Sequence, residues 1–431
     1  MKRKVVSLLL TAVMAVGLVA GCGNNEEKPG TNPDDKNPGQ QQTTDGKYDG
    51  VTLEYWSMWN NSEPQGKVLQ EAADAFEKET GAKINITWKG RDINTIIQSS
   101  LEAKDKIDLF EEDYQRISMN YKDHLLDLTD MAKAANYDAK SYACFNDNVK
   151  KWAGFLACIT EQPQVGGIFY NQDIFKDAGI DTLPATWDEF MAACQKMKDK
   201  GYEPMALDSA YATFFAGYHF ERNLGEERVT ELAAKGGWSQ DAKAVKAAQE
   251  LIDFVKAGYL ADGAPDEYPA SQNKMGLTQK VAMVVCANYV CAEINGNTNV
   301  ELNWGLMNYP TVKDGVTTTN SYAGANAIAI AKYTKNAQAA FDFAMFLTSG
   351  EYDQKMADTA SQIPADPSNT APAIMNGTVE VLKATTNPLS WSMGLESNSD
   401  VTAMVTDWAA QLFSGNYATG EAAMQALDAF Y

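Results

Sequence analysis

Aromatic rings stand next to amide and carboxylate side chains in four loops that each follow a predicted strand. These loops are residues 56–61, 111–114, 208–211 and 288–289. An aromatic ring can stack on the C–H face of a sugar, while carboxylates and amides can hydrogen-bond its hydroxyl groups. Ligands of open α/β sheets bind outside the carboxyl ends of the strands, so these loops indicate a site for a neutral, ring-shaped ligand.

The sequence lacks the common catalytic and metal-binding patterns. It contains no Gly-x-Ser-x-Gly nucleophile elbow and no Gly-x-x-x-x-Gly-Lys phosphate loop. Only two histidines are present, His124 and His219, and no cysteines are spaced as zinc ligands. A glycosidase would need two carboxylates about 5–9 Å apart, and any acidic chain offers such pairs by chance. We therefore predict no enzyme, no metal and no cofactor.

The elements that must position these loops begin as alternating strands and helices. Residues 51–56, 82–88 and 107–110 have the β-branched and aromatic content of strands. A helix with Pro64 in its first turn precedes the second strand and ends at Gly81, and another helix follows Asp92. This strand–helix alternation predicts a parallel sheet covered by helices.

A second group of elements begins near Gly167. Thr186 and Glu189 form a capping box, which predicts that a helix starts there and ends before Gly201. Further helices are expected at 240–257, 400–413 and 421–430, and further strands at 167–171, 281–286 and 327–330. The expected fold class is α/β.

The N-terminus has the pattern of a secretory signal peptide. Lys2, Arg3 and Lys4 precede an apolar run over residues 5–19, which is too short to span a membrane comfortably. The ending Val19-Ala20-Gly21-Cys22 resembles a bacterial lipobox, in which Cys22 is lipidated and becomes the first mature residue. An ordinary signal peptide with a chance cysteine is the alternative.

Composition predicts a tether followed by a globular body outside the cell. Residues 23–50 are rich in Gly, Asn, Pro, Gln, Asp and Thr, which predicts a flexible leash. Loss of the three basic residues with the signal would leave 33 basic and 57 acidic residues, a formal charge of −24. This acidity argues against nucleic acid as a partner. We predict a protein that a lipid anchors to the outer face of the cell membrane, in a Gram-positive bacterium.

Five cysteines remain if Cys22 carries a lipid. Because five is odd, at least one thiol must stay unpaired. Bridges between Cys144 and Cys158 or between Cys286 and Cys291 remain open alternatives, and buried thiols are expected at Cys194 and Cys286.

Several motifs, in order along the chain, resemble one family. They include Gly167-Ile-Phe-Tyr-Asn-Gln-Asp-Ile-Phe-Lys-Asp-Ala-Gly-Ile180, Gln279-Lys-Val-Ala-Met283, Trp304-Gly-Leu-Met-Asn-Tyr-Pro310 and Ile363-Pro-Ala365. Together they are similar to the extracellular solute-binding proteins of carbohydrate ABC importers, of the family 1 type. The resemblance covers nearly all of the chain after the leash.

The resemblance implies a two-lobed periplasmic-binding-protein-like fold of type II with a ligand cleft between the lobes. Lobe 1 would combine residues 50–160 with 320–365, and lobe 2 would combine 165–315 with 366–431. A monomer of this kind would deliver a carbohydrate to ABC permease subunits, which a separate ATPase would drive.

Strand-end loops and matching family positions together give the expected ligand-binding residues. Trp56, Trp59 and Asn60 share one such loop, while Trp238 is equally well explained as part of the core. For the acidic residues the alternative is a solvated turn. The full set is Trp56, Trp59, Asn60, Glu112, Asp113, Glu161, Asp208, Tyr211, Trp238, Asn288, Tyr289, Tyr322, Gly324 and Trp391.

Three functions fit this sequence. The first is capture of a sugar or oligosaccharide, with closure of the lobes around the ligand. The second is the same fold serving a non-sugar solute, either an amino-acid derivative or a polyamine, which the acidic excess permits. The third is a secreted glycosidase. Many aromatic residues with few basic candidates favour the neutral sugar.

Overall fold

A computed structural model describes residues 46–431. The expected signal peptide and Cys22 lie outside the described residues. No helix within residues 46–431 combines the length and apolar character needed to cross a bilayer. The expected leash is too long at its C-terminal end, because Tyr48 is part of the fold. Its backbone N–H donates to Thr80 O at 2.6 Å, and its ring stacks on Phe76.

The first part of the fold has the predicted alternation of strands and helices. Strand β1 (Thr52–Ser57) pairs in parallel with β2 (Lys83–Trp88) and β3 (Leu109–Asp113). Helices α1 (Pro64–Thr80) and α2 (Ile93–Ala103) connect them. Pro64 occupies the first helical turn, where its missing N–H costs nothing, and Gly81 ends α1 in the left-handed conformation.

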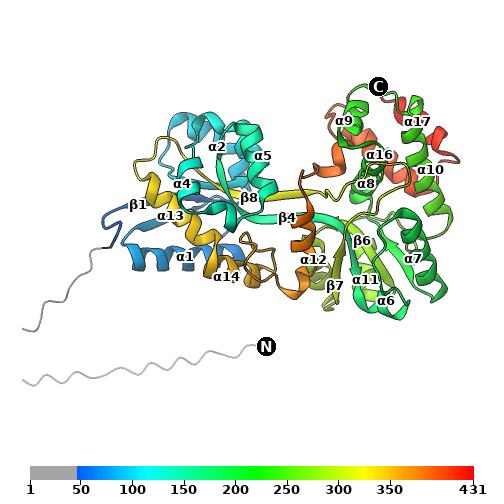
Figure 1. Ribbon diagram of the computed structural model, residues 1–431, viewed down its shortest axis with the longest axis horizontal. Helices are drawn as coiled ribbons and strands as arrows, with labels where there is room; N and C mark the ends of the chain where they lie inside the picture. The colour runs from blue at the N-terminus through cyan, green and yellow to red at the C-terminus, as the bar shows by residue number, and fades with distance from the viewer. Residues whose placement is uncertain (1–45) are drawn as a thin grey trace, which may run out of the picture. The chain divides into compact units, whose positions relative to one another are not determined.

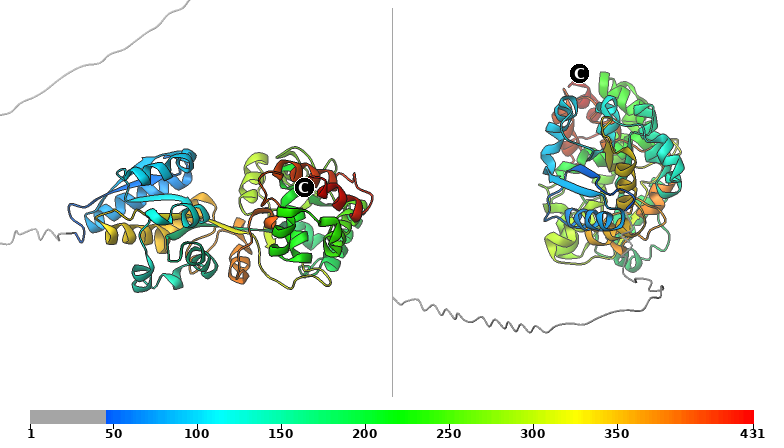
Figure 2. Two further views of the ribbon diagram at one scale, coloured as in Figure 1. Left: turned by 90° about the horizontal axis from the view of Figure 1, so that it is seen from above. Right: turned by 90° about the vertical axis from the view of Figure 1, so that its left-hand side faces the viewer.

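Helices cover both faces of this part of the sheet (Figures 1 and 2). Tyr55 packs edge-on against Phe343 of α13 on one face, and Phe110 packs against Tyr121 beyond α3 on the other. The remaining helices of this part are α3 (Tyr114–Asn120), α4 (Thr129–Ala134), α5 (Ala143–Ala153), α13 (Ala337–Thr348) and α14 (Gly350–Ala360).

Two long antiparallel strands continue the sheet into its second part. Strand β4 (Cys158–Asn171) pairs with β8 (Ala323–Ile330) over its first half and with β6 (Val281–Ala287) and β7 (Trp304–Met307) from Gly166 onward. The strand order is β2-β1-β3-β8-β4-β6-β5, with β7 also paired to β4. Figure 1 shows β4 and β8 side by side where the chain passes between the two parts.

The second part surrounds β5 (Glu203–Ala206), β6 and β7 with helices. The capping box predicted at Thr186 is present, since Glu189 N–H donates to Thr186 Oγ1 at 3.3 Å and Thr186 N–H donates to Glu189 Oε2 at 3.1 Å. The helices are α6 (Gln172–Asp177), α7 (Trp187–Asp199), α8 (Ala212–Leu224), α9 (Glu226–Lys235), α10 (Ala242–Lys256), α11 (Ala270–Thr278), α12 (Tyr289–Thr298), α15 (Thr378–Ala384), α16 (Thr402–Phe413) and α17 (Gly420–Asp428).

All five cysteines of the described chain are free thiols and buried. The two bridges left open by the sequence are therefore not formed. Burial raises the pKa of the Cys144, Cys158 and Cys286 thiols to about 12, so they behave as small apolar side chains rather than reactive thiolates.

Two of the three buried glutamates in the first part, Glu111 and Glu161, have strongly perturbed carboxyl groups. Glu111 on β3 accepts hydrogen bonds from Tyr55 Oη, Ser57 Oγ and Met58 N at 2.7–2.9 Å. Glu161 is the extra residue of a bulge in β4, and neither of its carboxylate oxygens has a hydrogen-bond partner among residues 46–431. Burial raises the pKa of Glu111 to about 7 and that of Glu161 well above its usual range, because a low-dielectric interior disfavours the charged carboxylate.

We expect the Glu111 carboxyl to stabilise the fold most at acid pH. Because the pKa of this carboxyl is higher in the folded than in the unfolded protein, its protonation stabilises the folded state. This stabilisation is complete below about pH 4.5 and is lost as the pH rises to about 7. The loss is on the order of 3 kcal/mol. Glu111→Gln, a neutral amide of the same shape, should show a smaller decrease in unfolding free energy across that window in urea titrations.

Glu54→Gln is the matched control for this titration. The pKa of Glu54 is lowered, despite partial burial, by hydrogen bonds from Lys106 and Asn85, so its stabilising contribution changes only at lower pH. Equal pH slopes for the wild-type protein and Glu111→Gln would contradict the assignment.

Candidate functional site

A cavity of about 330 Å³ lies where the first residues of β8 meet side chains from both parts of the sheet. Helices α3 and α5 line one side of it, and α9 with the loop 387–391 lines the other. The lining mixes aromatic rings with carboxylates and amides. Its residues are Asp113, Tyr114, Gln115, Asn148, Lys151, Trp152, Glu226, Tyr322, Ala323, Gly324, Asn387, Pro388, Leu389, Ser390 and Trp391.

Trp391 is the centre of an aromatic cluster in this cavity. Its ring is half-buried and lies 4.4 Å from Phe214, at an interplanar angle of 32°. Tyr322 meets it edge-on at 5.4 Å, and Tyr211 lies 6.3 Å away. Rings packed in this way are held in fixed orientations, so a ligand stacking on Trp391 meets a preformed surface.

Helix α8 holds the loop that carries Trp391. Gly217 lies so close to Ser392 that a β-carbon would stand 2.2 Å from Ser392 O, which explains why a residue without a side chain is needed there. At the start of α9, the Glu226 carboxylate accepts hydrogen bonds from Ser390 N at 2.7 Å and Ser390 Oγ at 2.6 Å. Both contacts restrain the Trp391 loop against the second part of the sheet.

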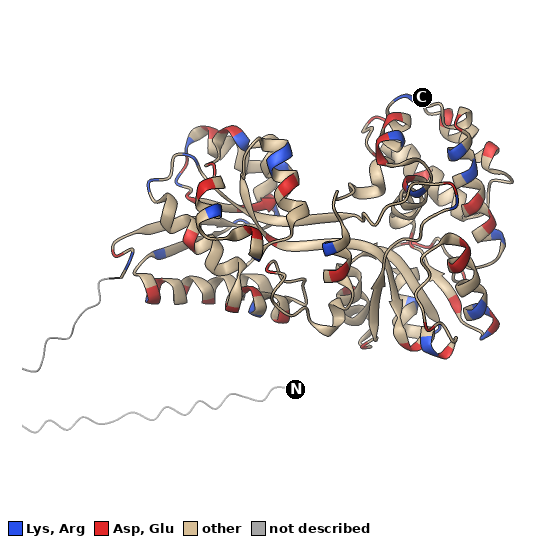
Figure 3. Ribbon diagram, viewed as in Figure 1, with Lys and Arg blue, Asp and Glu red and all other residues tan. Residues whose placement is uncertain are grey.

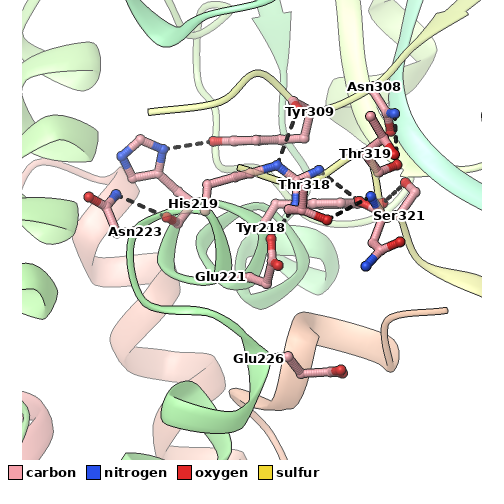
Figure 4. Close-up of polar contacts among 12 residues, drawn as sticks. Tyr218, His219, Glu221, Asn223, Glu226, Asn308, Tyr309, Thr318, Thr319 and Ser321 are labelled. Atoms are coloured by element: carbon pink, nitrogen blue, oxygen red, sulfur yellow. Dashed lines mark hydrogen bonds and ion pairs between the residues drawn. The ribbon is translucent and has the colours of Figure 1, made fainter. Parts of the chain in front are cut away.

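Helix α8 also hydrogen-bonds the residues where β4 and β8 cross (Figure 4). Tyr218 Oη lies 2.7 Å from Ser321 Oγ and accepts a hydrogen bond from Tyr322 N at 3.0 Å. Ser321 Oγ donates in turn to Gly166 O on β4 at 2.6 Å. The Tyr218 hydroxyl therefore links α8 to the residues that lead into β8 and, through Ser321, to β4.

Arg222, also on α8, is fully buried and fixes the segment that leads into β8. Its guanidinium donates to Tyr309 O at 3.3 Å and to Asn320 O at 2.8 Å, and it pairs with Glu221. A buried guanidinium needs such partners, because an unpaired charge in the interior is strongly destabilising. The segment before Ser321 is thus attached to the second part of the fold.

Four of the residues predicted from the sequence line the cavity, namely Asp113, Tyr322, Gly324 and Trp391. Tyr211 packs edge-on against Trp391 at 6.3 Å, and Tyr289 is half-buried at the start of α12. Asp113 also caps α3, because its Oδ1 accepts from Arg116 N at 2.9 Å, and burial raises its pKa. These residues, far apart in the sequence, are brought to one side of the sheet crossing.

Trp56, Trp59 and Asn60 do not line this cavity. Trp59 and Asn60 follow β1, but Trp56 lies inside that strand rather than in the predicted loop. Cations cover both rings, because Lys89 Nζ lies 3.7 Å from the Trp56 ring centroid and Arg91 Cζ lies 4.2 Å from that of Trp59. Trp59 is buried, and Asn60 is exposed. The tryptophan faces that the sequence offered for stacking are therefore partly occupied by cation–π contacts.

Three further residues predicted to bind ligand instead pack in the core or hydrogen-bond the backbone. Trp238 is fully buried and meets Phe220 edge-on, because Asp428 accepts hydrogen bonds from Gly237, Trp238 and Ser239 and holds this turn inward. Asp208 accepts from the backbone of Ser271 and Gln272. Asn288 Oδ1 accepts from Val165 N at 3.0 Å.

The two predicted glutamates are also buried away from the cavity lining. Glu161 is the bulge residue of β4, and the Glu112 carboxylate lies 3.3 Å from the guanidinium of Arg116 on α3. In a strand, neighbouring side chains point to opposite faces, and a bulge shifts that alternation by one residue. The motif matches could not show which face each carboxylate occupies.

Sequence reasoning missed the residues that come from helices rather than strand ends. Gln115, Asn148, Lys151 and Trp152 lie on α3 and α5, and Glu226 lies on α9. The Trp152 ring packs 5.2 Å from Tyr114, which places a second aromatic pair at the cavity. No local pattern marked these helical positions, since their role depends on where each helix packs.

Comparison with known proteins identifies the family. The bacterial extracellular solute-binding protein family matches residues 59–354. A multiple sugar-binding protein of Streptococcus mutans is 24% identical, over 74% of this chain and 76% of its own length. The diacetylchitobiose binding protein DasA of Streptomyces coelicolor is 26% identical, over 84% of this chain and 82% of its own length.

A solved structure has the same fold. A chitin oligosaccharide binding protein superposes with a TM-score of 0.62 at 20% identity, covering 88% of this chain and 97% of that structure. The α/β fold class of the periplasmic-binding-protein type, predicted from the sequence, is confirmed. The chain belongs to the bacterial extracellular solute-binding protein family.

Proposed function

We propose that this protein captures a sugar or oligosaccharide outside the cell and delivers it to an ABC permease. As a member of a solute-binding family, the chain is not an enzyme. The observation that carries the proposal is the half-buried Trp391 ring, fixed by Phe214 and Tyr322 in a cavity that also holds carboxylates and amides. Relatives named for multiple sugars and for diacetylchitobiose support this choice of ligand.

The polar lining supports a neutral ligand. Asp113, Gln115, Asn148 and Asn387 can accept or donate hydrogen bonds to hydroxyl groups, and among the described lining residues Lys151 is the only Lys or Arg. A site for an anionic ligand would be expected to contain several Arg or Lys side chains. Figure 3 shows acidic residues on the helices of both parts, interspersed with basic ones.

In this proposal the ligand is enclosed by movement of two lobes about the crossing strands. Lobe 1 comprises residues 50–160 and 320–365, and lobe 2 comprises 165–315 and 366–431. The junction of Tyr218, Ser321 and Gly166 lies at the boundary and supports this division. Ligand contacts from both sides would stabilise the closed state, which the permease would recognise.

Attachment to the cell completes the proposed function. The lipobox-like Val19-Ala20-Gly21-Cys22 supports a lipid on Cys22 and a position on the outer face of a Gram-positive membrane. The protein would act as a monomer with permease subunits as its partners, and with the ATPase engaged only through them.

A cationic solute such as a polyamine is the second candidate. The carboxylates of Asp113 and Glu226 in the cavity favour it, as both could pair with an ammonium group. Aromatic faces can also bind a cation. A thermal-shift panel that contains both polyamines and glycans separates this candidate from a sugar.

We expect a glycan series to raise the melting temperature of the full chain in a thermal-shift panel that includes amino acids and polyamines. A ligand at a hundredfold excess over its Kd adds about 2.7 kcal/mol of stability. Trp391→Ala should weaken glycan binding at least tenfold, or about 1.4 kcal/mol, while Trp391→Phe retains part of the affinity. Calorimetric titration measures both.

Trp88→Ala is the matched control, since Trp88 is also half-buried but lies outside the cavity. Its glycan affinity should equal that of the wild-type protein. A thermal shift confined to polyamines or amino acids would replace the sugar with the second candidate.

Lys151 and Glu226 offer a test of closure. Lys151 on α5 and Glu226 on α9 would belong to different lobes, and both line this cavity and a neighbouring one of about 820 Å³. We expect Lys151→Glu and Glu226→Lys each to weaken ligand binding and the double exchange to restore part of it, with a coupling of about 0.5–3 kcal/mol.

This coupling should weaken at high ionic strength, because salt screens exposed charge pairs. Affinities of the four proteins, measured by calorimetry at low and high salt, give the coupling. Additive losses in the double variant would argue that the two charges act separately on the ligand.

A further inference from the structure

The aromatic cluster of the cavity continues outward as a row of four rings. Tyr322 and Trp391 lie 5.4 Å apart, Trp391 and Tyr211 lie 6.3 Å apart, and Tyr211 and Tyr268 lie 5.8 Å apart. Tyr322 and Trp391 line the cavity, whereas Tyr268 does not. The row therefore leads from the cavity to a ring beyond it.

Tyr268 is unusually exposed for a tyrosine of this chain. Its side chain is 43% exposed, and of the 19 tyrosines only the terminal Tyr431 is comparably exposed. An aromatic ring normally buries most of its surface, so an exposed one next to a binding site offers area to a partner.

The exposed ring is nevertheless held in place. Its loop is attached to the end of β5, because Ser209 N donates to Asp266 O at 2.8 Å and Asp266 N donates to Leu207 O at 3.1 Å. The Tyr268 ring meets the buried Tyr211 ring edge-on, at an interplanar angle of 82°. A ring fixed in this way loses little conformational entropy when a ligand binds.

A carboxylate lies beside the same ring. Glu293 on α12 is half-buried and accepts a hydrogen bond from Gln272 Nε2 at 3.2 Å. Burial raises the pKa of the Tyr268 hydroxyl, and the nearby Glu293 carboxylate raises it further. An aromatic face and an acceptor thus stand together, which are the two surfaces that a sugar requires.

We propose that Tyr268 and Glu293 form an outer subsite that binds a further pyranose unit of an unbranched oligosaccharide. The inference rests on the proposed function, in which the preceding units lie at Trp391. Through the buried Tyr211, the Tyr268 ring stands two ring contacts, of 6.3 and 5.8 Å, from Trp391, so an oligosaccharide bound at Trp391 can extend to it. The preferred ligand is accordingly a neutral oligosaccharide that extends past the cavity, rather than a monosaccharide.

The test measures affinity against ligand length. Chitin oligosaccharides and maltooligosaccharides of about two to six units are titrated calorimetrically into the full chain. Here the affinity of the wild-type protein rises with length until the outer subsite is filled. Tyr268→Ala removes the last increase, a loss of about three- to tenfold for the longer ligands, and leaves the affinity for the shortest ligand unchanged.

Three further variants make the result specific. Tyr268→Phe keeps the ring and retains most of the length dependence, and Glu293→Gln reduces it. Tyr202→Ala is the matched control, because Tyr202 also bonds a carboxylate, Asp177, at 3.1 Å, but stands outside the row. Near-ultraviolet circular dichroism establishes that each variant is folded.

The outcomes separate this inference from the function on which it rests. The same length dependence in Tyr268→Ala and in the wild-type protein overturns the subsite, as does an equal loss at every length, which indicates a structural role. If neither series binds and a polyamine or amino acid does, the proposed function itself fails, and the subsite fails with it.

Discussion

The fold and the cavity both depend on a buried hydrogen-bonded junction at the crossing of two long strands. There, Ser321 Oγ donates to Gly166 O and lies next to Tyr218 Oη, which also accepts from Tyr322 N. In a low-dielectric interior each of these groups would be costly to leave unpaired, so the junction specifies a single register for β4, β8 and α8. Elements distant in the sequence are aligned by this one contact.

Helix α8 extends the consequences of the junction in two directions. Toward the cavity, Phe214 supports Trp391, and Gly217 allows the loop at Ser392 to approach the helix. Toward the start of β8, Arg222 binds the carbonyls of Tyr309 and Asn320. A rigid helix that contacts both the stacking ring and the crossing strands provides a direct physical connection between ligand contacts and the proposed closure.

Much of the local structure followed from residue patterns. The strand–helix alternation of the first part, the stop at Gly81 and the capping box at Thr186 are all observed, because each depends on near neighbours in the chain. The fold begins before the predicted end of the leash at residue 50, since Tyr48 gains its partners Phe76 and Thr80 only after folding. Composition alone could not reveal those contacts.

Residue patterns along the chain were sufficient to predict the α/β fold class and the family. Which side chains share a cavity depends on contacts between elements that are distant in the sequence. Asp113, Tyr322 and Trp391 meet there because β3 pairs with β8, and Tyr322, just before β8, pairs with Leu389 of the 387–391 loop. Trp238 and Glu161 are buried elsewhere. Helical periodicity and strand alternation assign a residue to a face, but the packing of that face against distant elements decides whether it meets solvent, core or ligand.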